Sequence, residues 1–397
     1  MICIKAIILA AGKATRMGEL CETLHKCMIP VGGKPLIEWN MEKLSDNVDE
    51  FVIVVGCRKD DIKKYFGDSF KGKKITYINQ AEQRGTGHAL LQVRGQMNVV
   101  EDKFIVLMGD DWYPRIELPS GLAIFSQRVE NPEKFGVLKI EDGKLMGIIE
   151  KPSAAKDKWK NELVNIGYYV LDGRVFDELQ HLQESPRGEL ELTDAIVSLA
   201  LKADLDVIEL SGWKGIAYPW ELLNVNNIAL EENEEGVNGI IDENVVIKGD
   251  VALGSGSSIL SGSYVEGGVR IGKNCKIGPN AYLRAGVSIG DNCHIGNCEV
   301  KNSIIMNRTN IPHFSYVGDS IIGRNCNLGA GTMVANLRFD GENVKCTVKE
   351  RKDTGLRKFG TVICDNVKTG VNVSIMPGVV VSSGSKIMPG EIIARDI

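Results

Sequence analysis

A ladder of aliphatic residues, one at every sixth position, runs through the second half of the chain. It holds without a miss at Ile241, Ile247, Leu253, Ile259, Val265, Ile271, Ile277, Leu283, Ile289 and Ile295. An α-helix repeats at about 3.6 residues and a half-buried strand at about two, so neither explains this period. A coil of three short parallel strands makes one turn per three hexapeptides and stacks such residues in its interior. The period therefore predicts a left-handed parallel β-helix.

The later rungs of this ladder shift register, and such shifts predict bulges or loops. The step slips near residues 299–303, resumes at 305, 311 and 317, slips again, and continues at 322, 328 and 334. A polar and basic stretch, residues 337–360, precedes a last series at 363, 369, 375, 381, 387 and 393. We interpret this stretch as a loop inserted between two coils. Regular coils of this kind are typical of acyl transfer or sugar binding, and a bare scaffold is the alternative.

Composition limits the classes of protein that this chain can be. Its 397 residues carry a net charge of −5, with 43% hydrophobic and 25% charged residues, as in soluble globular proteins of two or three domains. An acidic chain without a basic stripe does not fit nucleic acid binding, and no run approaches the ~20 apolar residues of a membrane span. The ten cysteines include no CxxC pair, which indicates reduced thiols. We therefore expect a cytoplasmic protein with small-molecule substrates and neither nucleic acid nor membrane partners.

The first half of the chain alternates apolar runs with amphipathic stretches. Strands are predicted at residues 4–10, 51–55, 74–78 and 104–108, and helices at 36–44 and 87–93. This alternation predicts an α/β Rossmann-like domain with a mostly parallel sheet and ligands at the carboxyl ends of its strands. We place this domain at residues 1–220, a helical linker at 221–236 and the β-helix at 237–397.

The first strand ends in a glycine-rich turn, LAAGKATRM at residues 9–17. Backbone N–H groups of such a turn can approach phosphate oxygens, and Arg16 and Lys26 can neutralise their charge. The turn has neither the spacing of a Walker loop nor that of the dinucleotide fingerprint, which argues against kinases and dehydrogenases. MGDD, at residues 108–111, ends another apolar strand, and a carboxylate at this place can hold Mg²⁺ against a triphosphate.

These motifs resemble those of the sugar-1-phosphate nucleotidylyltransferases, whose usual signature is LAAGxGTRM. Ala14 stands where the family usually has its second glycine, and alanine tolerates positive φ less well. QAEQRGTGHA, at residues 80–89, is similar to the uridine-recognition segment of the bifunctional N-acetylglucosamine-1-phosphate uridylyltransferase and glucosamine-1-phosphate acetyltransferase. The resemblance implies nucleotide contacts at Leu9, Ala10, Gly12, Gln80, Gln83, Gly85 and Thr86, and catalytic roles for Arg16 and Lys26.

Further positions match the same family in order. The resemblance implies that Gly136, Glu150 and Asn165 contact the sugar and that Lys151 lies near its phosphate. It assigns the magnesium ligands to Asp110 and Asn226. In the implied reaction an oxygen of the sugar 1-phosphate attacks the α-phosphorus of UTP, and pyrophosphate leaves.

The β-helix carries a second match, NIPHFSYVGDSIIGRNCNLGAGTMVAN at residues 310–336, which resembles the acetyltransferase segment of this bifunctional family. Acetyl transfer to the amine of glucosamine 1-phosphate needs a base, and His313 is the candidate. The resemblance implies that Arg284, Lys301 and Tyr316 hold the sugar phosphate. The remaining residues implied for this site are Asn327, Ala330, Asn336 and Lys345.

The motifs together indicate a bifunctional enzyme that makes UDP-N-acetylglucosamine from UTP, acetyl-CoA and glucosamine 1-phosphate with Mg²⁺. Two alternatives stay open. The first is a nucleotidylyltransferase of other or broader specificity, acting with dTTP or glucose 1-phosphate, whose β-helix only mediates assembly. The second is a non-catalytic regulatory subunit, which the intact Arg16, Lys26 and Asp110 disfavour. Because β-helices of this kind pack through flat faces, we expect a homotrimer.

Overall fold

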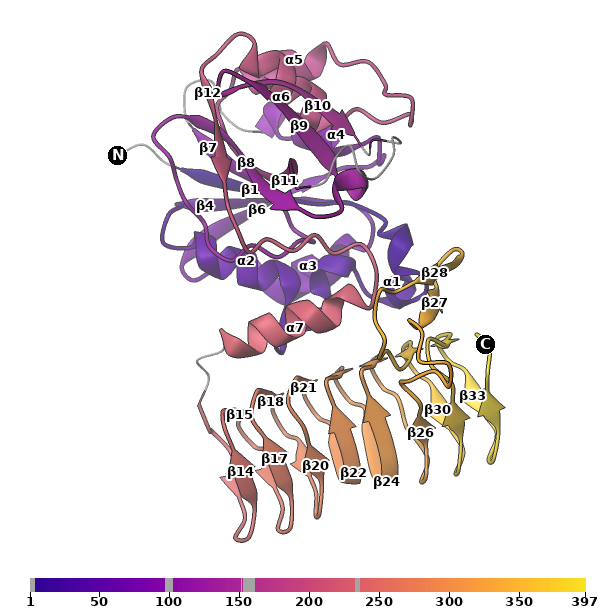
Figure 1. Ribbon diagram of the computed structural model, residues 1–397. Coiled ribbons are helices and arrows are strands. Elements are labelled where there is room, and N and C mark those ends of the chain that lie inside the picture. Colours follow the sequence, from indigo (N-terminus) through magenta and orange to yellow (C-terminus); the bar gives the residue numbers. More distant parts are fainter. Residues whose placement is uncertain (1–3, 97–102, 151, 153–160, 233–235) are drawn as a thin grey trace. The chain divides into compact units, whose positions relative to one another are not determined.

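A computed structural model describes residues 4–96, 103–150, 152, 161–232 and 236–397 of the chain (Figure 1). The chain forms two compact units. Residues 1–13 and 36–215 make up the first, and residues 14–35 and 216–397 the second. The predicted combination of an α/β domain and a β-helix is confirmed.

The centre of the first unit is a sheet in which the order β7-β1-β4-β6 is parallel. Three of these four strands, β1, β4 and β7, read as nearly continuous apolar runs, because both faces of a parallel sheet are covered. The four strands are β1 (Lys5–Ala10), β4 (Glu50–Val55), β6 (Lys73–Asn79) and β7 (Phe104–Met108). The four strands predicted from sequence are thus confirmed.

Further strands extend this sheet at both edges. Strand β11 joins β7 in antiparallel orientation and also pairs with β8 and β9. The added strands are β5 (Ser69–Phe70), β8 (Leu122–Val129), β9 (Gly136–Glu141), β10 (Lys144–Glu150), β11 (Glu162–Leu171) and β12 (Leu205–Glu209). The helices are α2 (Leu36–Leu44), α3 (Lys59–Phe66), α4 (Thr86–Leu91), α5 (Val175–Gln180) and α6 (Leu192–Ala200), with 3-10 turns at η3 (Arg94–Gln96) and η4 (Pro132–Lys134).

The second unit begins with a segment that the sequence had placed in the sheet domain. Residues 14–35 contain η1 (Thr15–Met17), α1 (Leu20–Thr23), η2 (Lys26–Met28) and a hairpin of β2 (Pro30–Val31) and β3 (Lys34–Pro35). Helix α7 (Glu221–Glu231) lies where a linker was predicted, and residues 233–235 of that linker fall outside the described ranges. Since one face of α7 is fully buried, the helix is part of this unit's packing.

The β-helix itself has three strand faces. One sheet contains β13 (Ile240–Ile241), β16 (Ser258–Ile259), β19 (Lys276–Ile277), β22 (His294–Lys301), β24 (Asn310–Gly318), β26 (Met333–Val334), β31 (Ser374–Ile375) and β34 (Ile392–Ile393), and off this path β14 (Val246–Lys248), β17 (Tyr264–Glu266) and β20 (Tyr282–Leu283). A second sheet contains β15 (Val251–Leu253), β18 (Val269–Ile271), β21 (Val287–Ile289), β23 (Ile304–Ile305), β25 (Ile321–Ile322), β29 (Val362–Ile363) and β32 (Val380–Val381). The remaining pairs are β30 (Lys368–Thr369) with β33 (Lys386–Ile387), and the hairpin β27 (Lys345–Thr347) with β28 (Arg351–Asp353).

Strand register confirms the predicted coil. Ile259 pairs with Ile277 and Leu253 with Ile271, a step of 18 residues that equals three hexapeptides. The first predicted slip coincides with a bulge between Asn297 and Glu299. Residues 337–360 contain the β27–β28 hairpin, and the coils before and after them pair directly, β25 with β29 and β26 with β31. The prediction of an inserted loop is therefore confirmed.

The interior of the coil is filled by the predicted rungs from Leu253 onward. The first rung differs, because Ile241 lies at the open end of the coil and is 36% exposed. Hydroxyl and thiol groups line one corner: Ser257 Oγ donates to the carbonyl of Gly272, and Cys275 Sγ donates to that of Gly290. Each cysteine in the described ranges is a free thiol. None of the described helices is long and apolar enough to cross a membrane.

Candidate functional site

The carboxyl edge of the first unit's sheet gathers several predicted nucleotide contacts. The N–H of Gly109, just after β7, donates to the carbonyl of Leu9 at 2.9 Å. Gly56, just after β4, lies close to both the glycine turn and the segment after β6. A Cβ atom built on Gly56 would lie 2.8 Å from the carbonyl oxygen of Ala11 and 2.9 Å from Gln83 Nε2. The glycine turn, the segment after β6 and the end of β7 therefore meet at one edge, as expected for a parallel sheet.

Gln80 and Gly85 shape the turn that precedes α4. Gln80 is only 3% exposed, and its Nε2 donates to the carbonyl of Gly85 at 3.1 Å. Gly85 has a φ of 104°, and a Cβ there would lie 2.6 Å from the Leu190 carbonyl oxygen, so only glycine fits. The hydroxyl of Thr86 accepts the N–H of Leu192 at 3.2 Å. These contacts fix the turn from inside, and the partly exposed Gln83 donates through Nε2 to the carbonyl of Gln80 at 3.4 Å.

Asp110 lies partly exposed at the end of β7 in a turn that its neighbours fix. The side-chain amide of Asn40 donates to the carbonyl of Asp111 at 2.8 Å. The Trp213 indole donates to the Asp111 carboxylate at 3.3 Å. In the described ranges no group of three or more His, Cys, Asp and Glu side chains forms a metal site. Mg²⁺ commonly takes only one or two protein carboxylates together with substrate phosphates, and Asp110 fits that mode.

Three of the predicted sugar contacts lie close together in the first unit. Gly136 pairs with Glu150 across β9 and β10, and a Cβ on Gly136 would lie 3.0 Å from Glu150 Oε1. Asn165 donates to the hydroxyl of Tyr169 at 2.7 Å. Burial raises the pKa of Tyr169, and the charge of Glu150 raises it further, so the hydroxyl stays protonated. Lys151 lies outside the described residues.

Arg187 is a residue of this cluster that the sequence did not reveal. Its guanidinium lies 2.6 Å from the Glu191 carboxylate and 3.7 Å from that of Glu150. Thr193 also donates to Glu150, at 3.1 Å. Arg187 lies in a stretch of sequence without a recognisable motif, so no sequence pattern could have predicted its contacts with Glu191 and Glu150.

Arg16 and Lys26 belong to the second unit by packing. Arg16 is exposed and lies in η1. The residue just before η1, Ala14, has a φ of 51° and a ψ of 40°, which is the left-handed conformation. Lys26 is 6% exposed, and its ammonium donates to the carbonyl of Ile216.

Replacing Ala14 with glycine is expected to raise the free energy of unfolding by up to ~1 kcal/mol, because alanine is strained in the left-handed conformation. Denaturant titration of the full chain measures this. As a control, Ala335→Gly is expected to lower stability, since Ala335 is exposed and not among the residues with positive φ. An Ala14→Gly protein less stable than the parent would contradict the strain argument.

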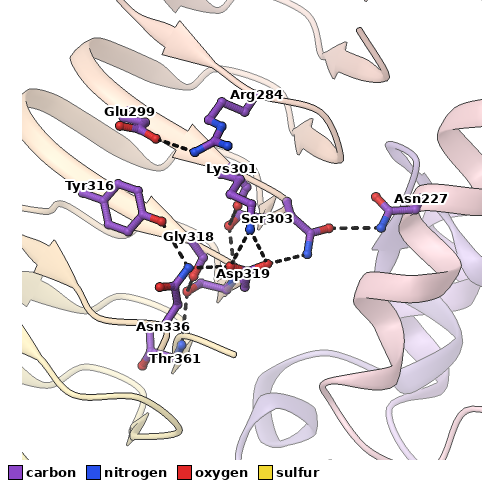
Figure 2. Close-up of polar contacts among 12 residues, drawn as sticks. Asn227, Arg284, Glu299, Lys301, Ser303, Tyr316, Gly318, Asp319, Asn336 and Thr361 are labelled. Carbon is purple, nitrogen blue, oxygen red and sulfur yellow. Dashed lines mark hydrogen bonds and ion pairs between the residues drawn. The ribbon is translucent and has the colours of Figure 1, made fainter. Parts of the chain in front are cut away.

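Four of the predicted acetyl-transfer residues lie along the coils of the β-helix, namely Arg284, Lys301, Tyr316 and Asn336 (Figure 2). Lys301 ends β22, and its ammonium contacts both carboxylate oxygens of Asp319, at 3.1 and 3.0 Å. The side-chain amide of Asn336 donates to the same carboxylate and to the hydroxyl of Tyr316, the latter at 3.1 Å. Arg284 donates to Glu299 at 3.0 Å. Hydrogen bonds thus join Lys301, Tyr316 and Asn336 into one cluster around a carboxylate.

Asp319 is the centre of this cluster and was not singled out from sequence. It is 3% exposed, and Asn302 also donates to it, at 2.7 Å. Asn302 in turn accepts from Asn227 of α7 at 3.1 Å (Figure 2). Burial and then the Asp319 charge raise the pKa of Tyr316. The position could have been flagged, because an aspartate in VGDS interrupts an otherwise apolar stretch of coil.

His313 lies on β24, where its exposed side chain faces away from the core. Its backbone carbonyl accepts the N–H of Gly331 at 3.2 Å, which places Ala330 on the next coil. The pKa of the neighbouring His294 is lowered by burial first, and then by Lys276 and His313. Asn327 is exposed and bridges to Asn310, while Lys345 is exposed in β27. His313 is therefore open to a ligand, and Asn327 and Lys345 are not tied to the Asp319 cluster by a described contact.

Asn226, a predicted magnesium ligand, packs within the second unit, and its metal role stays a prediction. Asn226 lies within α7 and is fully buried. Its Oδ1 accepts the N–H of Gly32 at 2.8 Å and the hydroxyl of Ser288 at 2.7 Å, and its Nδ2 donates to Gly286 at 3.0 Å. These hydrogen bonds satisfy the buried side chain and join α7 to the β2–β3 hairpin and to the coil.

Comparisons with known proteins agree with both halves of this description. The family model described as nucleotidyl transferase matches residues 5–232, and the one described as the GMPPB C-terminal domain matches residues 263–351. The solved UDP-glucose pyrophosphorylase complexed with UDP-glucose covers 58% of this chain and 100% of its own, with TM-score 0.51 and 22% identity. A putative glucose-1-phosphate thymidylyltransferase from Bacillus anthracis covers 57% and 95%, with TM-score 0.50 and 28% identity.

Similar curated proteins span nearly the whole chain. The bifunctional protein GlmU of Methanococcus maripaludis strain C7 is 48% identical over 99% of this chain and 95% of its own. The bifunctional sugar-1-phosphate nucleotidylyltransferase/acetyltransferase of Sulfurisphaera tokodaii is 39% identical over 99% and 98%. On this likeness and its two-part fold, the chain belongs to the GlmU-like family of bifunctional sugar-1-phosphate nucleotidylyltransferase/acetyltransferases.

Proposed function

We propose that the chain makes UDP-N-acetylglucosamine in two reactions. The β-helix transfers an acetyl group from acetyl-CoA to glucosamine 1-phosphate. The N-terminal domain then transfers uridylyl from UTP to N-acetylglucosamine 1-phosphate and releases pyrophosphate. The observation that carries the proposal is the cluster of Lys301, Tyr316 and Asn336 on the coils that also present His313.

In the uridylyl transfer, an oxygen of the sugar 1-phosphate attacks the α-phosphorus of UTP in line with the leaving pyrophosphate. Arg16 and Lys26 would stabilise the charge that develops on the phosphates, and Asp110 would hold Mg²⁺. The metal, when bound, neutralises triphosphate oxygens. Gly136, Glu150 and Asn165 support sugar binding, because a glycine at 136 leaves room beside the Glu150 carboxylate.

In the acetyl transfer, the amine of glucosamine 1-phosphate attacks the thioester carbon of acetyl-CoA. His313 would take a proton from the attacking amine, the C–S bond breaks, and CoA leaves as its thiol. Arg284 and Lys301 would attract the sugar phosphate. Asn336 would orient the acceptor, since its amide is held by the Tyr316 hydroxyl and the Asp319 carboxylate.

We also propose a cytoplasmic homotrimer. Exposed Phe314 and Met333, on the coil face formed by β24 and β26, offer apolar area to a second copy. The free thiols of the described cysteines fit a reducing compartment.

A single experiment separates this proposal from its main alternative. The purified chain is incubated with glucosamine 1-phosphate, acetyl-CoA, UTP and Mg²⁺, each omitted in turn, and the products are identified by mass spectrometry. Acetylated sugar phosphate without UTP, and UDP-N-acetylglucosamine with all components, are the expected results. Nucleotide sugar formed only from pre-acetylated substrate would favour the alternative, in which the β-helix mediates assembly.

Replacing Asp110 with asparagine is expected to lower uridylyl transfer by roughly 10²-fold or more, because a carboxylate that holds Mg²⁺ against the triphosphate is lost. Pyrophosphate release at increasing Mg²⁺ measures the effect. Asp111→Asn is the matched control and should lose much less, because the Asp111 carboxylate accepts from Trp213. Equal losses in the two variants would contradict the assignment.

A further inference from the structure

The segment that carries Arg16 and Lys26, residues 14–35, packs with the β-helix in the second unit. It begins within the glycine-rich turn of residues 9–17, yet its hydrogen bonds reach residues far away in the sequence. Thr23 contacts residues 342 positions away, and Gly32 contacts a residue 194 positions away. The middle and the C-terminal end of the segment are therefore held by residues of the C-terminal half.

The first of these attachments is a clasp formed by Thr23, Arg324 and Asp365. The Thr23 hydroxyl donates to Asp365 Oδ2 at 2.8 Å. The backbone carbonyl of Thr23 accepts from Arg324 Nη2, also at 2.8 Å. Arg324 in turn donates to Asp365 through Nε at 2.9 Å, Nη2 at 2.5 Å and its backbone N–H at 2.6 Å. The Asp365 side chain is only 5% exposed. Charge-assisted bonds at a buried carboxylate are among the stronger hydrogen bonds in proteins.

The second attachment is at the β2–β3 hairpin. The N–H of Gly32 donates to Asn226, which also bonds to Ser288 and Gly286 of the coil. A Cβ on Gly32 would lie 2.6 Å from the Cβ of Ala229 in α7. The hairpin therefore packs directly on α7, and α7 on the coil. Lys26 lies between the two attachments.

We propose that Arg324 and Asp365 are positioning residues for nucleotidyl transfer, because they hold the segment that presents Arg16 and Lys26. The inference rests on the proposed function of those two cations. It assigns the β-helix a role in the reaction of the other domain, apart from acetyl transfer. Misplacing a catalytic group by about 1 Å can lower a rate about 10²-fold, so anchors at a distance from the chemistry matter.

The test compares three single variants of the full chain with the parent. Asp365→Asn weakens the whole clasp. Thr23→Val removes only the hydroxyl that joins the segment to Asp365 and leaves the Arg324–Asp365 pair of the coil intact. Asp340→Asn is the matched control, because Asp340 is likewise paired with an arginine of this unit, Arg338, but lies in the inserted loop.

Two readouts are taken from each variant. Hydrogen–deuterium exchange without substrate reports the protection of peptides within residues 14–35, and steady-state kinetics report pyrophosphate release and acetyl transfer separately. We expect about tenfold faster exchange in these peptides for Asp365→Asn and a smaller rise for Thr23→Val. The kcat of uridylyl transfer should fall roughly tenfold in Asp365→Asn, with acetyl transfer within about twofold of the parent. Asp340→Asn should match the parent in both readouts.

Unchanged exchange in residues 14–35 for both clasp variants would overturn the inference, whatever the activities. Loss of both activities in parallel in Thr23→Val would also overturn it, since that pattern indicates general destabilisation. A parent protein that releases no pyrophosphate would instead overturn the proposed function, and with it the catalytic part of this inference. The hydrogen–deuterium exchange data would then still show whether the clasp holds residues 14–35. Failure of this inference and failure of the proposed function are therefore distinguishable.

Discussion

Replacing His313 with alanine is expected to lower acetyl transfer by about 10²–10⁴-fold and to leave uridylyl transfer unchanged. The reason is that the amine of the acceptor is protonated in water and attacks the thioester only after it loses a proton. His313 is exposed on β24, on the coils that also carry Lys301 and Asn336, so an imidazole there is available to a substrate. Release of free CoA thiol measures the first reaction and pyrophosphate release the second.

His294 provides the matched control for this substitution. It lies on β22, the coil strand that pairs with β24, and is more buried than His313. His294→Ala removes an imidazole from the same wall without removing the proposed base, and should retain most of the acetyl transfer. If His294→Ala lost as much activity as His313→Ala, the coil wall and not a specific base would be responsible.

The second large effect is expected for Asp319. Asp319→Ala should destabilise the β-helix by about 3–5 kcal/mol, because it leaves the Lys301 ammonium without its carboxylate in a mostly buried place. It should also lower acetyl transfer at least tenfold, since Lys301 and Asn336 lose the group that orients both. Chemical denaturation followed by circular dichroism measures the first effect, and the KM for glucosamine 1-phosphate the second.

Two further variants separate charge from shape at this position. Asp319→Asn keeps the size of the side chain but replaces one acceptor oxygen with a donor that faces other donors, so it should resemble alanine in activity and be milder in stability. Asn302→Ala removes one neutral donor to Asp319 and should be milder in both. If Asp319→Asn kept full acetyl transfer with a normal KM, the carboxylate would have no orienting role.

Sequence periodicity predicted much of this fold, because the coil repeats a local physical constraint. Each hexapeptide must place one aliphatic side chain inside, so the rungs can be read without any knowledge of distant contacts. The bulge near Glu299 and the inserted loop were also predicted, because the six-residue spacing of the aliphatic residues is interrupted at both places. The sheet strands were predictable for a similar reason, since strands covered on both faces read as apolar runs.

The parts that sequence did not predict depend on contacts between distant residues. Residues 14–35 look like a continuation of the glycine turn, and only the three-dimensional contacts of Thr23 and Gly32 place them with the β-helix. Asn226 was assigned to a metal by motif order, whereas its position inside α7 buries it. Asp319 interrupts an apolar stretch of coil, but its contacts with Lys301, Asn302 and Asn336 could not be read from that interruption. The roles of the other proposed site residues stay predictions until the variants are measured.

The inserted loop has a consequence for how such a chain can change over generations. The coils before and after residues 337–360 pair directly, Ile321 with Val362 and Ile322 with Ile363, so the stack closes beneath the loop. Lengthening a loop whose ends are already fixed adds little entropic penalty, about 0.6 kcal/mol per doubling. Segments of other lengths and charges can therefore be exchanged at this point while the stack stays intact. Such exchange leaves the coil wall that carries His313 unaltered.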